Sequence, residues 1–165
     1  MAKRMTNLRR TQTDFEERVL EIQRVAKVVQ GGRRFSFRAS VVLGDKQGKI
    51  GFGVGKANEV TSAVAKAVID AKRSMIVFPR DGSTIPHEIF VKYKGVKILL
   101  KPARKGTGII AGGPVRAFAE CGGIGDILSK SLGSNTILNV ARAMVKALET
   151  LRSVPVRNVE RSLVA

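Results

Sequence analysis

The clearest pattern along the chain is an alternation of apolar and polar residues between positions 33 and 57. In RRFSFRASVVLG, apolar side chains occupy every second position from Phe35 to Leu43. Arginine or serine occupies the positions between them up to Ser40. A period of two residues is that of a β-strand with one polar face. The turn residues GDKQG follow, so the sequence predicts a hairpin leading into a second strand.

The second strand, KIGFGVGKA, has glycine at every other position. One face is therefore apolar and the other has no side chains; its glycines are Gly51, Gly53 and Gly55. A strand face of this kind is typical of close approach by another backbone or by a ligand. Two nucleotide-binding motifs fail here, because Ile50 replaces the first glycine of a Walker A loop and Lys56 the third glycine of a dinucleotide fingerprint.

Two further segments complete a first structural unit. Apolar residues recur between Val19 and Val29, and because most of them are β-branched, the segment is predicted to be a strand. Asn58 is predicted to cap a helix in which small and apolar residues repeat every three or four positions up to Met75. The expected unit is a three-stranded sheet backed by one helix.

The stretch FPRDGSTIP interrupts this pattern with two prolines and a glycine, and it predicts a domain boundary. Beyond it, HEIFVKYKGVKILLKPA predicts two strands, PVRAFAEC a short helix and IGDILSKSLG another strand. An apolar stripe from Ile137 to Leu151 predicts a last helix capped by Ser134 or Asn135. The expected organisation is a disordered basic arm at 1–14, domains at 15–78 and 79–152, and a tail at 153–165.

The charge of the chain narrows the class of partner. Lys and Arg number 30 against 13 Asp and Glu, a net charge of +17, and both halves of the chain share this excess. Such a charge exceeds what solubility requires and indicates a polyanion, with nucleic acid as the first candidate and a merely solvated basic surface as the alternative. No apolar run approaches the roughly 20 residues of a membrane span, so no membrane partner is expected.

Residues with catalytic or metal-binding chemistry are scattered. Cys121 is the only cysteine, which excludes an internal disulfide and fits a reducing cytoplasm, and His87 is the only histidine. The glycine cluster at 105–114 resembles a dinucleotide loop, but Asp126, the acid nearest the required spacing, precedes its apolar run instead of ending it. We therefore expect no enzyme activity, no cofactor and no metal site.

The segment KVVQGGRR is the best candidate for phosphate contact. Gly31 and Gly32 predict a turn that is flexible or has positive φ, and Lys27, Arg33 and Arg34 flank it. Such a turn would present cations and free backbone N–H groups together. A hairpin turn with solvated arginines is the alternative. Phe35 and its neighbour Phe37 alternate with polar residues, which favours core packing over base stacking.

These segments together resemble a known family. The motifs GGRRFSF at 31–37, Gly44-Asp45, GKIGFGVGKA at 48–57, GTGIIAGGPVRA and SLGSN closely resemble bacterial-type small-subunit ribosomal protein five over about residues 15–152. The resemblance implies an α+β chain: an N-terminal sheet and helix like a double-stranded-RNA-binding domain, then a C-terminal α/β domain with a left-handed βαβ crossover. The sequence departs from the family pattern at Thr136-Ile137, where Asn-Pro is usual.

The resemblance also implies a function and partners. It implies a non-enzymatic constituent of the small ribosomal subunit, in a cytoplasm of bacterial type or in a plastid, that binds rRNA, steadies the head against the body, and contributes to the mRNA entry channel and to translational accuracy. Ribosomal proteins four and eight are the implied neighbours. A free-standing RNA-binding translation factor or RNA chaperone is the alternative, and a nucleotide-dependent enzyme built on the 105–114 loop is a weaker one.

Site residues follow from the motifs and from the resemblance. Those assigned to rRNA binding are Lys27, Gly31, Gly32, Arg33, Arg34, Arg38, Lys49, Gly51, Gly53, Gly55 and Lys56. Those assigned to a protein interface facing ribosomal protein four are Gly106, Thr107, Gly108 and Arg116.

Overall fold

The computed structural model describes residues 15–152, so the predicted basic arm and tail lie outside the described residues. Eight strands and three helices follow one another as β1 (Glu16–Val29), β2 (Gly32–Gly44), β3 (Lys49–Ala57), α1 (Val60–Arg73), β4 (Met75–Val77), β5 (Ile89–Tyr93), β6 (Val96–Pro102), β7 (Ile109–Ile110), α2 (Gly113–Gly122), β8 (Ile127–Gly133) and α3 (Ile137–Thr150). They form two four-stranded sheets, and the predicted α+β class is confirmed.

The first sheet has the strand order β1-β2-β3-β4 and is antiparallel throughout. The predicted strands and helix are present, but the sequence pattern missed β4. Met75 was expected to extend the helix, whereas α1 ends at Arg73. The hydroxyl of Ser74 donates to the carbonyl oxygen of Phe52 at 2.7 Å, which ties the chain to β3 where the helix stops.

The glycine face of β3 packs directly on α1. A Cβ built on Gly53 would lie 2.1 Å from the carbonyl oxygen of Ala67 and 2.3 Å from the backbone nitrogen of Ala71. The fully buried residues of the helix are Ala63, Ala67 and Ala71, so the two backbones lie closer than larger side chains at these positions would allow. The close neighbour that the bare strand face predicted is therefore a backbone of the same chain.

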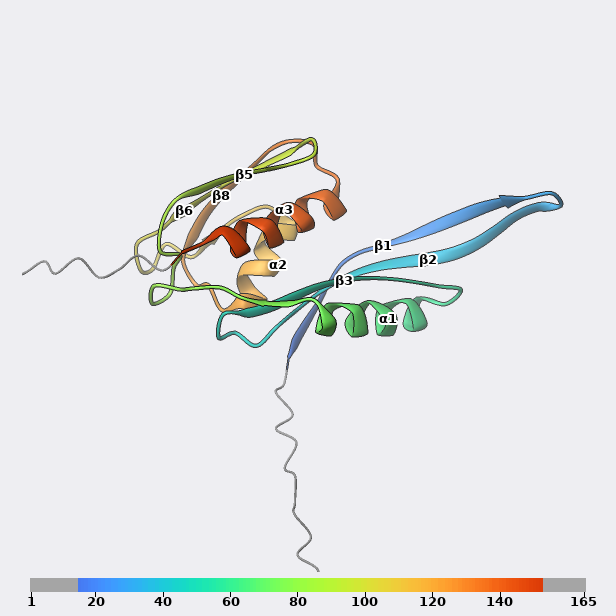
Figure 1. The fold of residues 1–165 in the computed structure, drawn as a ribbon, viewed down its shortest axis with the longest axis horizontal. Helices are drawn as coiled ribbons and strands as arrows, with labels where there is room; N and C mark the ends of the chain where they lie inside the picture. Colours follow the sequence, from blue (N-terminus) through green and yellow to red (C-terminus); the bar gives the residue numbers. More distant parts are fainter. Residues whose placement is uncertain (1–14, 153–165) are drawn as a thin grey trace, which may run out of the picture.

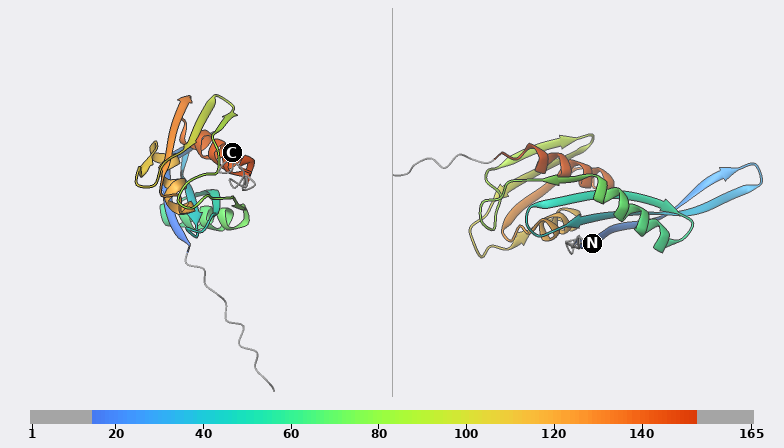
Figure 2. Two further views of the ribbon diagram at one scale, coloured as in Figure 1. Left: turned by 90° about the vertical axis from the view of Figure 1, so that its left-hand side faces the viewer. Right: turned by 60° about the horizontal axis from the view of Figure 1, so that its bottom comes forward.

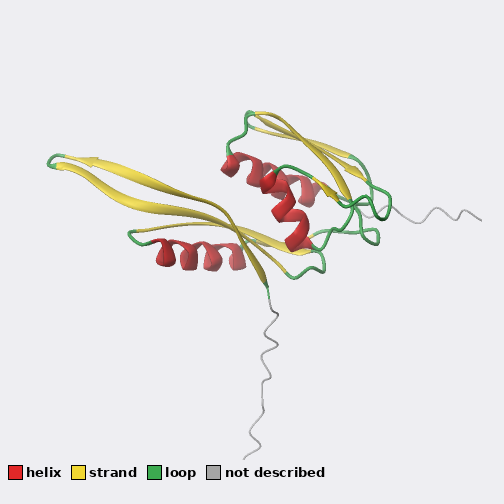
Figure 3. Ribbon diagram, turned by 180° about the vertical axis from the view of Figure 1, so that it is seen from behind, coloured by secondary structure: helices red, strands yellow, loops and turns green. Residues whose placement is uncertain are grey.

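The second sheet has the strand order β5-β6-β8-β7, and β7 runs parallel to β8. Helix α2 connects these two strands, which gives the βαβ unit that the family resemblance implies. Helices α2 and α3 lie between the two sheets, while α1 covers the opposite face of the first sheet (Figures 1 and 3). One face of the second sheet is thus buried against helices.

The helix starts differ from those predicted. The N-cap positions are Glu59 for α1 and Thr136 for α3, and neither side chain makes a capping hydrogen bond. Asn58, expected to cap α1, instead accepts a hydrogen bond at 3.4 Å from the hydroxyl of Ser36. None of the helices within 15–152 is long and apolar enough to cross a membrane.

The two halves of the structure meet where the β2–β3 turn touches the end of α2. The backbone N–H of Lys46 donates to the carbonyl oxygen of Cys121 at 3.0 Å. The guanidinium of Arg80 donates to the carbonyl oxygens of Lys46 and Gly123, at 3.1 and 2.9 Å. Buried side chains of both sheets form one apolar cluster, in which Val42 and Ile50 of the first sheet join residues of α2 and α3.

Candidate nucleic-acid interface

The hairpin of β1 and β2 projects beyond the rest of the molecule as a two-stranded arm (Figures 1 and 2). Val29 pairs with Gly32, so the turn at its tip consists of Gln30 and Gly31. Gly32, the first residue of β2 after this turn, has φ of 139°, so the positive φ predicted for the Gly31-Gly32 pair is found at Gly32 but not at Gly31. No other atom lies within 4 Å of a Cβ built on Gly31 or Gly32, so the backbone of the tip is open to a partner.

The strand register collects four of the predicted cations on one face. Lys27 lies opposite Arg34, and Arg38 lies opposite Lys56. Opposite residues share a face in an antiparallel pair, and the even spacing of the two β2 arginines keeps both pairs on the same side. We call these four residues the cationic face. Like charges placed opposite one another destabilise a sheet, so a polyanion bound here would offset that repulsion.

Hydrogen bonds fix the inner part of the cationic face. The guanidinium of Arg38 donates to the side-chain oxygen of Gln23, and the amide of Gln23 donates to the carboxylate of Glu21 at 2.5 Å. Arg38 is half-buried, whereas the other three cations are exposed. Within the described part of the chain these three make no ion pair, so their charge is available to a ligand.

The opposite face of the arm differs in character. Arg33 points to this side, opposite Val28, and is therefore separated from Arg34 by the sheet. Phe35 is 48% exposed, and the guanidinium of Arg24 lies over its ring, 3.7 Å from the ring centre. The core packing predicted for Phe35 is thus wrong, because α1 does not extend beneath the arm. Sequence reasoning also missed Arg24, whose stacking depends on cross-strand register.

The assignment of Gly51, Gly53 and Gly55 to rRNA contact needs correction. All three are buried, and α1 occupies the face from which their side chains are missing. Lys49 is exposed but lies at the far end of β3 from Lys56 and on the α1 side of the sheet. The structure therefore does not bring these four residues together with the cationic face.

The predicted protein-interface loop is held by a buried acid. One carboxylate oxygen of Asp126 accepts hydrogen bonds from the backbone N–H groups of Gly106 and Gly108 at 3.0 and 2.9 Å. The other accepts from the hydroxyl of Ser83 at 2.6 Å, and Asp126 itself is only 6% exposed. The Ser83 hydroxyl first, and then the Gly108 N–H, hold the pKa of Asp126 below its usual range. Both carboxylate oxygens are therefore engaged by hydrogen bonds from within the chain.

The loop presents its outer surface to solvent. Gly106, Thr107 and Arg116 are exposed, and the guanidinium of Arg116 donates to the carbonyl oxygen of Ile109 at 2.9 Å. That bond holds Arg116 beside the loop, so the four residues assigned to a protein interface lie together. Both Gly106 and Gly108 have positive φ, 93° and 76°, which explains the need for glycine at these positions.

Ion pairs at the base of the arm involve a different set of charges. The carboxylate of Glu16 lies 2.7 Å from the ammonium of Lys46, and the carboxylate of Glu120 lies 3.1 Å from the guanidinium of Arg18. Hydrogen bonding to Lys46 lowers the pKa of Glu16. These pairs join β1 to the β2–β3 turn and to α2. Among residues 15–152, acids therefore neutralise cations at the base of the arm and not at its tip.

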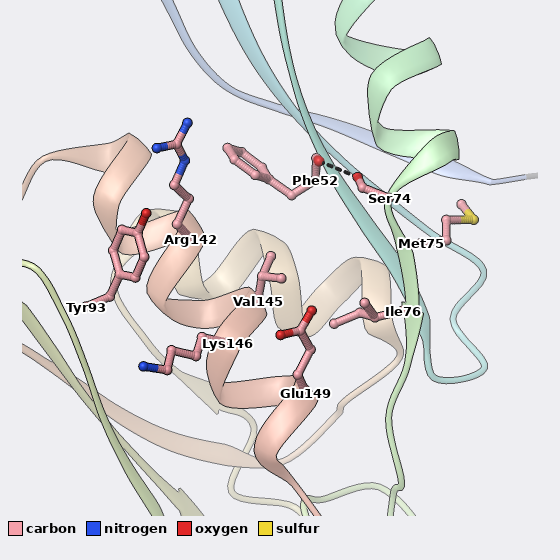
Figure 4. Close-up of a pocket in the computed structure, with 9 residues that line it drawn as sticks. All are labelled: Phe52, Ser74, Met75, Ile76, Tyr93, Arg142, Val145, Lys146 and Glu149. Carbon is pink, nitrogen blue, oxygen red and sulfur yellow. Dashed lines mark hydrogen bonds between the residues drawn. The ribbon is translucent and has the colours of Figure 1, made fainter.

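A groove of about 570 Å³ lies between the first sheet and α3 (Figure 4). Phe52, Ile76 and Val145 supply apolar walls, and Arg142 and Glu149 supply charges of opposite sign. None of the predicted site residues lines this groove. Its mixed charge and its position between the halves distinguish it from the cationic face.

Comparison with known protein families matches both halves of the chain. The family model described as ribosomal protein S5, N-terminal domain, matches residues 15–79, which include the arm and the cationic face. The model described as ribosomal protein S5, C-terminal domain, matches residues 91–161, which include the loop held by Asp126. Because these matches cover most of the sequence, the chain belongs to the ribosomal protein S5 family.

Proposed function

We propose that the cationic face and the tip of the arm form the rRNA-binding site. Membership of the family identifies the chain as a structural, rRNA-binding protein of the small ribosomal subunit. The observation that supports the site is the register that places Lys27 opposite Arg34 and Arg38 opposite Lys56 on a projecting hairpin. Strand geometry separates Arg34 from Arg38 by about 13 Å, so the face spans two or more phosphates of a strand.

The chemistry of this face suits recognition of an RNA backbone. Helical RNA is bound largely through its phosphates, 2′-hydroxyls and shape, and arginine and lysine supply donors to phosphate. The open glycine tip adds backbone N–H groups that can approach closely. The exposed Phe35 with its stacked Arg24 offers a contact for an unpaired base on the other side of the arm.

Alanine substitution of Arg34 is expected to weaken rRNA binding and to reduce the magnitude of the salt slope by about 0.7 to 0.9, the amount for one lost phosphate contact. Arg33→Ala should have a smaller effect, since Arg33 lies on the opposite face. Binding of the full chain to small-subunit rRNA, measured at several salt concentrations, gives both slopes.

Lys72→Ala is the matched control, because Lys72 is exposed on α1, away from the arm. It should leave the slope unchanged while removing the same charge. Equal slopes for Arg34→Ala and Lys72→Ala would argue against phosphate contact at the cationic face. Circular dichroism of each variant shows whether the fold is retained.

We further propose that the loop containing Gly106, Thr107, Gly108 and Arg116 faces ribosomal protein four, with ribosomal protein eight as a second neighbour. In this position the chain steadies the head against the body and contributes to the mRNA entry channel and to decoding accuracy. The support is the exposure of the loop, its rigid attachment through Asp126, and its place in the half of the chain opposite the arm. A rigid chain with a binding surface in each half can transmit a shift between two subunit conformations.

Gly108→Arg is expected to alter the misreading of near-cognate codons while small subunits still assemble. No atom lies within 4 Å of a Cβ on Gly108, so the new side chain would extend outward and meet a partner, not the core. A reporter of translational errors, in cells whose only copy carries the variant, measures the effect; Arg116→Leu tests the same surface.

Gly82→Arg is the matched control for this substitution. Gly82 also has positive φ, 58°, and open space around its Cβ, so the backbone strain is similar but the surface is another. If subunits shown to contain the Gly108→Arg variant translated with the wild-type error frequency, the proposed interface at this loop would be refuted. Error frequencies raised equally by both variants would attribute the effect to strain.

Co-sedimentation distinguishes the proposed role from that of a free-standing translation factor or RNA chaperone. A constituent of the small subunit should remain bound through a moderate salt wash of purified subunits. Release at low salt, with most of the protein outside ribosomal fractions, would favour the free factor.

A further inference from the structure

The outer face of the second sheet carries an apolar and cationic surface that none of the described helices covers. Helices α2 and α3 both pack on the inner face, where Val91, Ile98 and Leu100 are buried (Figure 1). On the outer face, Phe90 is 56% exposed and Leu132 is 42% exposed. Within 15–152 the sheet therefore has one face in the core and one face without a protein layer.

The register gathers apolar and cationic side chains into two adjacent rows on that outer face. Each row contains one residue from β5, one from β6 and one from β8. The first row is Phe90, Leu99 and Lys130, and the second is Lys92, Lys97 and Leu132. Strand spacing and rise make this a patch about 10 Å wide by 7 Å high between backbone positions. We call these six residues the outer patch.

Electrostatics of the outer patch point to an acidic partner. Lys92 lies directly opposite Lys97, a like-charge pair that destabilises the sheet. Lys101 has a partner, because its ammonium lies 3.3 Å from the carboxylate of Glu88, whereas Lys92, Lys97 and Lys130 form no ion pair with any described residue. Carboxylates brought by a partner would offset the repulsion between the opposed lysines.

The apolar part of the outer patch distinguishes a protein from an RNA. Binding of single-stranded RNA uses several aromatic rings on which successive bases stack, but Phe90 is the one aromatic side chain of the patch. Leucine side chains offer no ring face to a base. An aromatic and aliphatic centre with charges at its rim is the composition of a protein–protein interface.

We propose that the outer patch docks a protein whose surface has an apolar centre and an acidic rim. Phe90 and Leu132 supply the buried contacts, and Lys92, Lys97 and Lys130 pair with carboxylates of the partner. This surface differs from the arm, which takes RNA, and from the loop at 106–108. It does not depend on the RNA site proposed above, because the two lie on different sheets.

Photo-crosslinking from the outer patch tests the proposal. Benzoylphenylalanine replaces Leu132 in the full-length chain, and intact cells are irradiated. We expect an adduct that survives RNase, disappears with protease, and contains a partner peptide rich in Asp or Glu beside apolar residues. An adduct that RNase removes, an adduct within the chain itself, or a basic partner peptide would overturn the proposal, as would the absence of any adduct.

Charge reversal supplies the matched comparison. Lys92→Glu combined with Lys97→Glu should reduce the adduct yield about tenfold, since like charges would then face the acidic rim. Lys66→Glu combined with Lys72→Glu, on exposed positions of α1, should leave it unchanged. Equal yields from both double variants would overturn the charge assignment, and urea midpoints near that of the parent chain exclude misfolding as the cause.

Discussion

Gly53→Val is expected to destabilise the folded chain by about 3 kcal/mol or more, at or above the upper end of the usual cost of overpacking. A Cβ at this position would overlap the backbone of α1, 2.1 Å from the carbonyl oxygen of Ala67 and 2.3 Å from the nitrogen of Ala71. Backbone atoms have no rotamer that relieves such an overlap, so α1 must move away from the sheet. Urea unfolding followed by circular dichroism measures the loss.

Gly31→Ala is the control for this substitution. Gly31 lies in the turn of the arm, where no other atom is within 4 Å of the added Cβ. The free energy of unfolding of the Gly31→Ala variant should differ from that of the parent chain by less than about 0.5 kcal/mol, as for most surface substitutions. If the two variants unfolded at the same urea concentration, the close packing of α1 on β3 would be refuted.

The packing of Gly53 shows what strand periodicity can and cannot predict. Alternation identified β3 and the face without side chains, because a period of two needs only local sequence. It did not identify the neighbour, since both a helix and an RNA backbone approach bare backbone closely. The sequence of α1 did contain a sign that the helix packs on the glycines. Ala63, Ala67 and Ala71 recur at four-residue spacing and form a helix face of small side chains.

The cationic face shows a similar limit. The sequence predicted that cations flank a glycine turn, and strand alternation alone separates Arg33 from Arg34. That Lys27 lies opposite Arg34 follows only from the cross-strand register, which the turn at Gln30 and Gly31 sets. Phe35 was expected in the core because alternation gives the side of a strand and not what covers that side. Coverage depends on where α1 lies relative to the arm, which is a tertiary property.

The sequence did not predict the shortest strands or the long-range hydrogen bonds, for physical reasons. β4 and β7 contain three and two residues, too few for a period to be recognised. Asp126 was judged by its spacing from a glycine cluster, whereas its role depends on Ser83, which lies far from it in sequence but 2.6 Å away in space. Only the folded chain brings these residues together.

Asp126→Ala is expected to produce a several-fold change in the error frequency of translation, the largest functional effect among the loop substitutions. The change removes the acceptor of the Gly106 and Gly108 N–H groups and of the Ser83 hydroxyl, so the loop loses the bonds that fix its shape. Asp126 is nearly buried and does not reach the loop surface, so it acts by positioning the residues proposed to face ribosomal protein four.

A graded series separates positioning from a general loss of fold. Asp126→Asn retains an oxygen acceptor for the two N–H groups but removes the charge, and Ser83→Ala removes only the hydroxyl bond. Error frequency should therefore change most in Asp126→Ala, less in Asp126→Asn and least in Ser83→Ala. Amide exchange of Gly106 and Gly108, measured by NMR, should accelerate in the same order while exchange in β2 stays slow.

The pH dependence of the loop provides an independent readout. Hydrogen bonds from Ser83 and Gly108 lower the pKa of Asp126, so the folded form binds its proton less readily than the unfolded form. Its stabilising effect is therefore complete above about pH 4, the ordinary carboxyl range, and is lost as the pH falls through the lowered value. The protection of the Gly106 and Gly108 amides, expressed relative to the intrinsic exchange rate at each pH, should fall across that acid range in the parent chain but not in Asp126→Asn. The same acid dependence in both chains, or an unaltered error frequency in Asp126→Ala with normal incorporation into subunits, would show that this carboxylate does not position the loop.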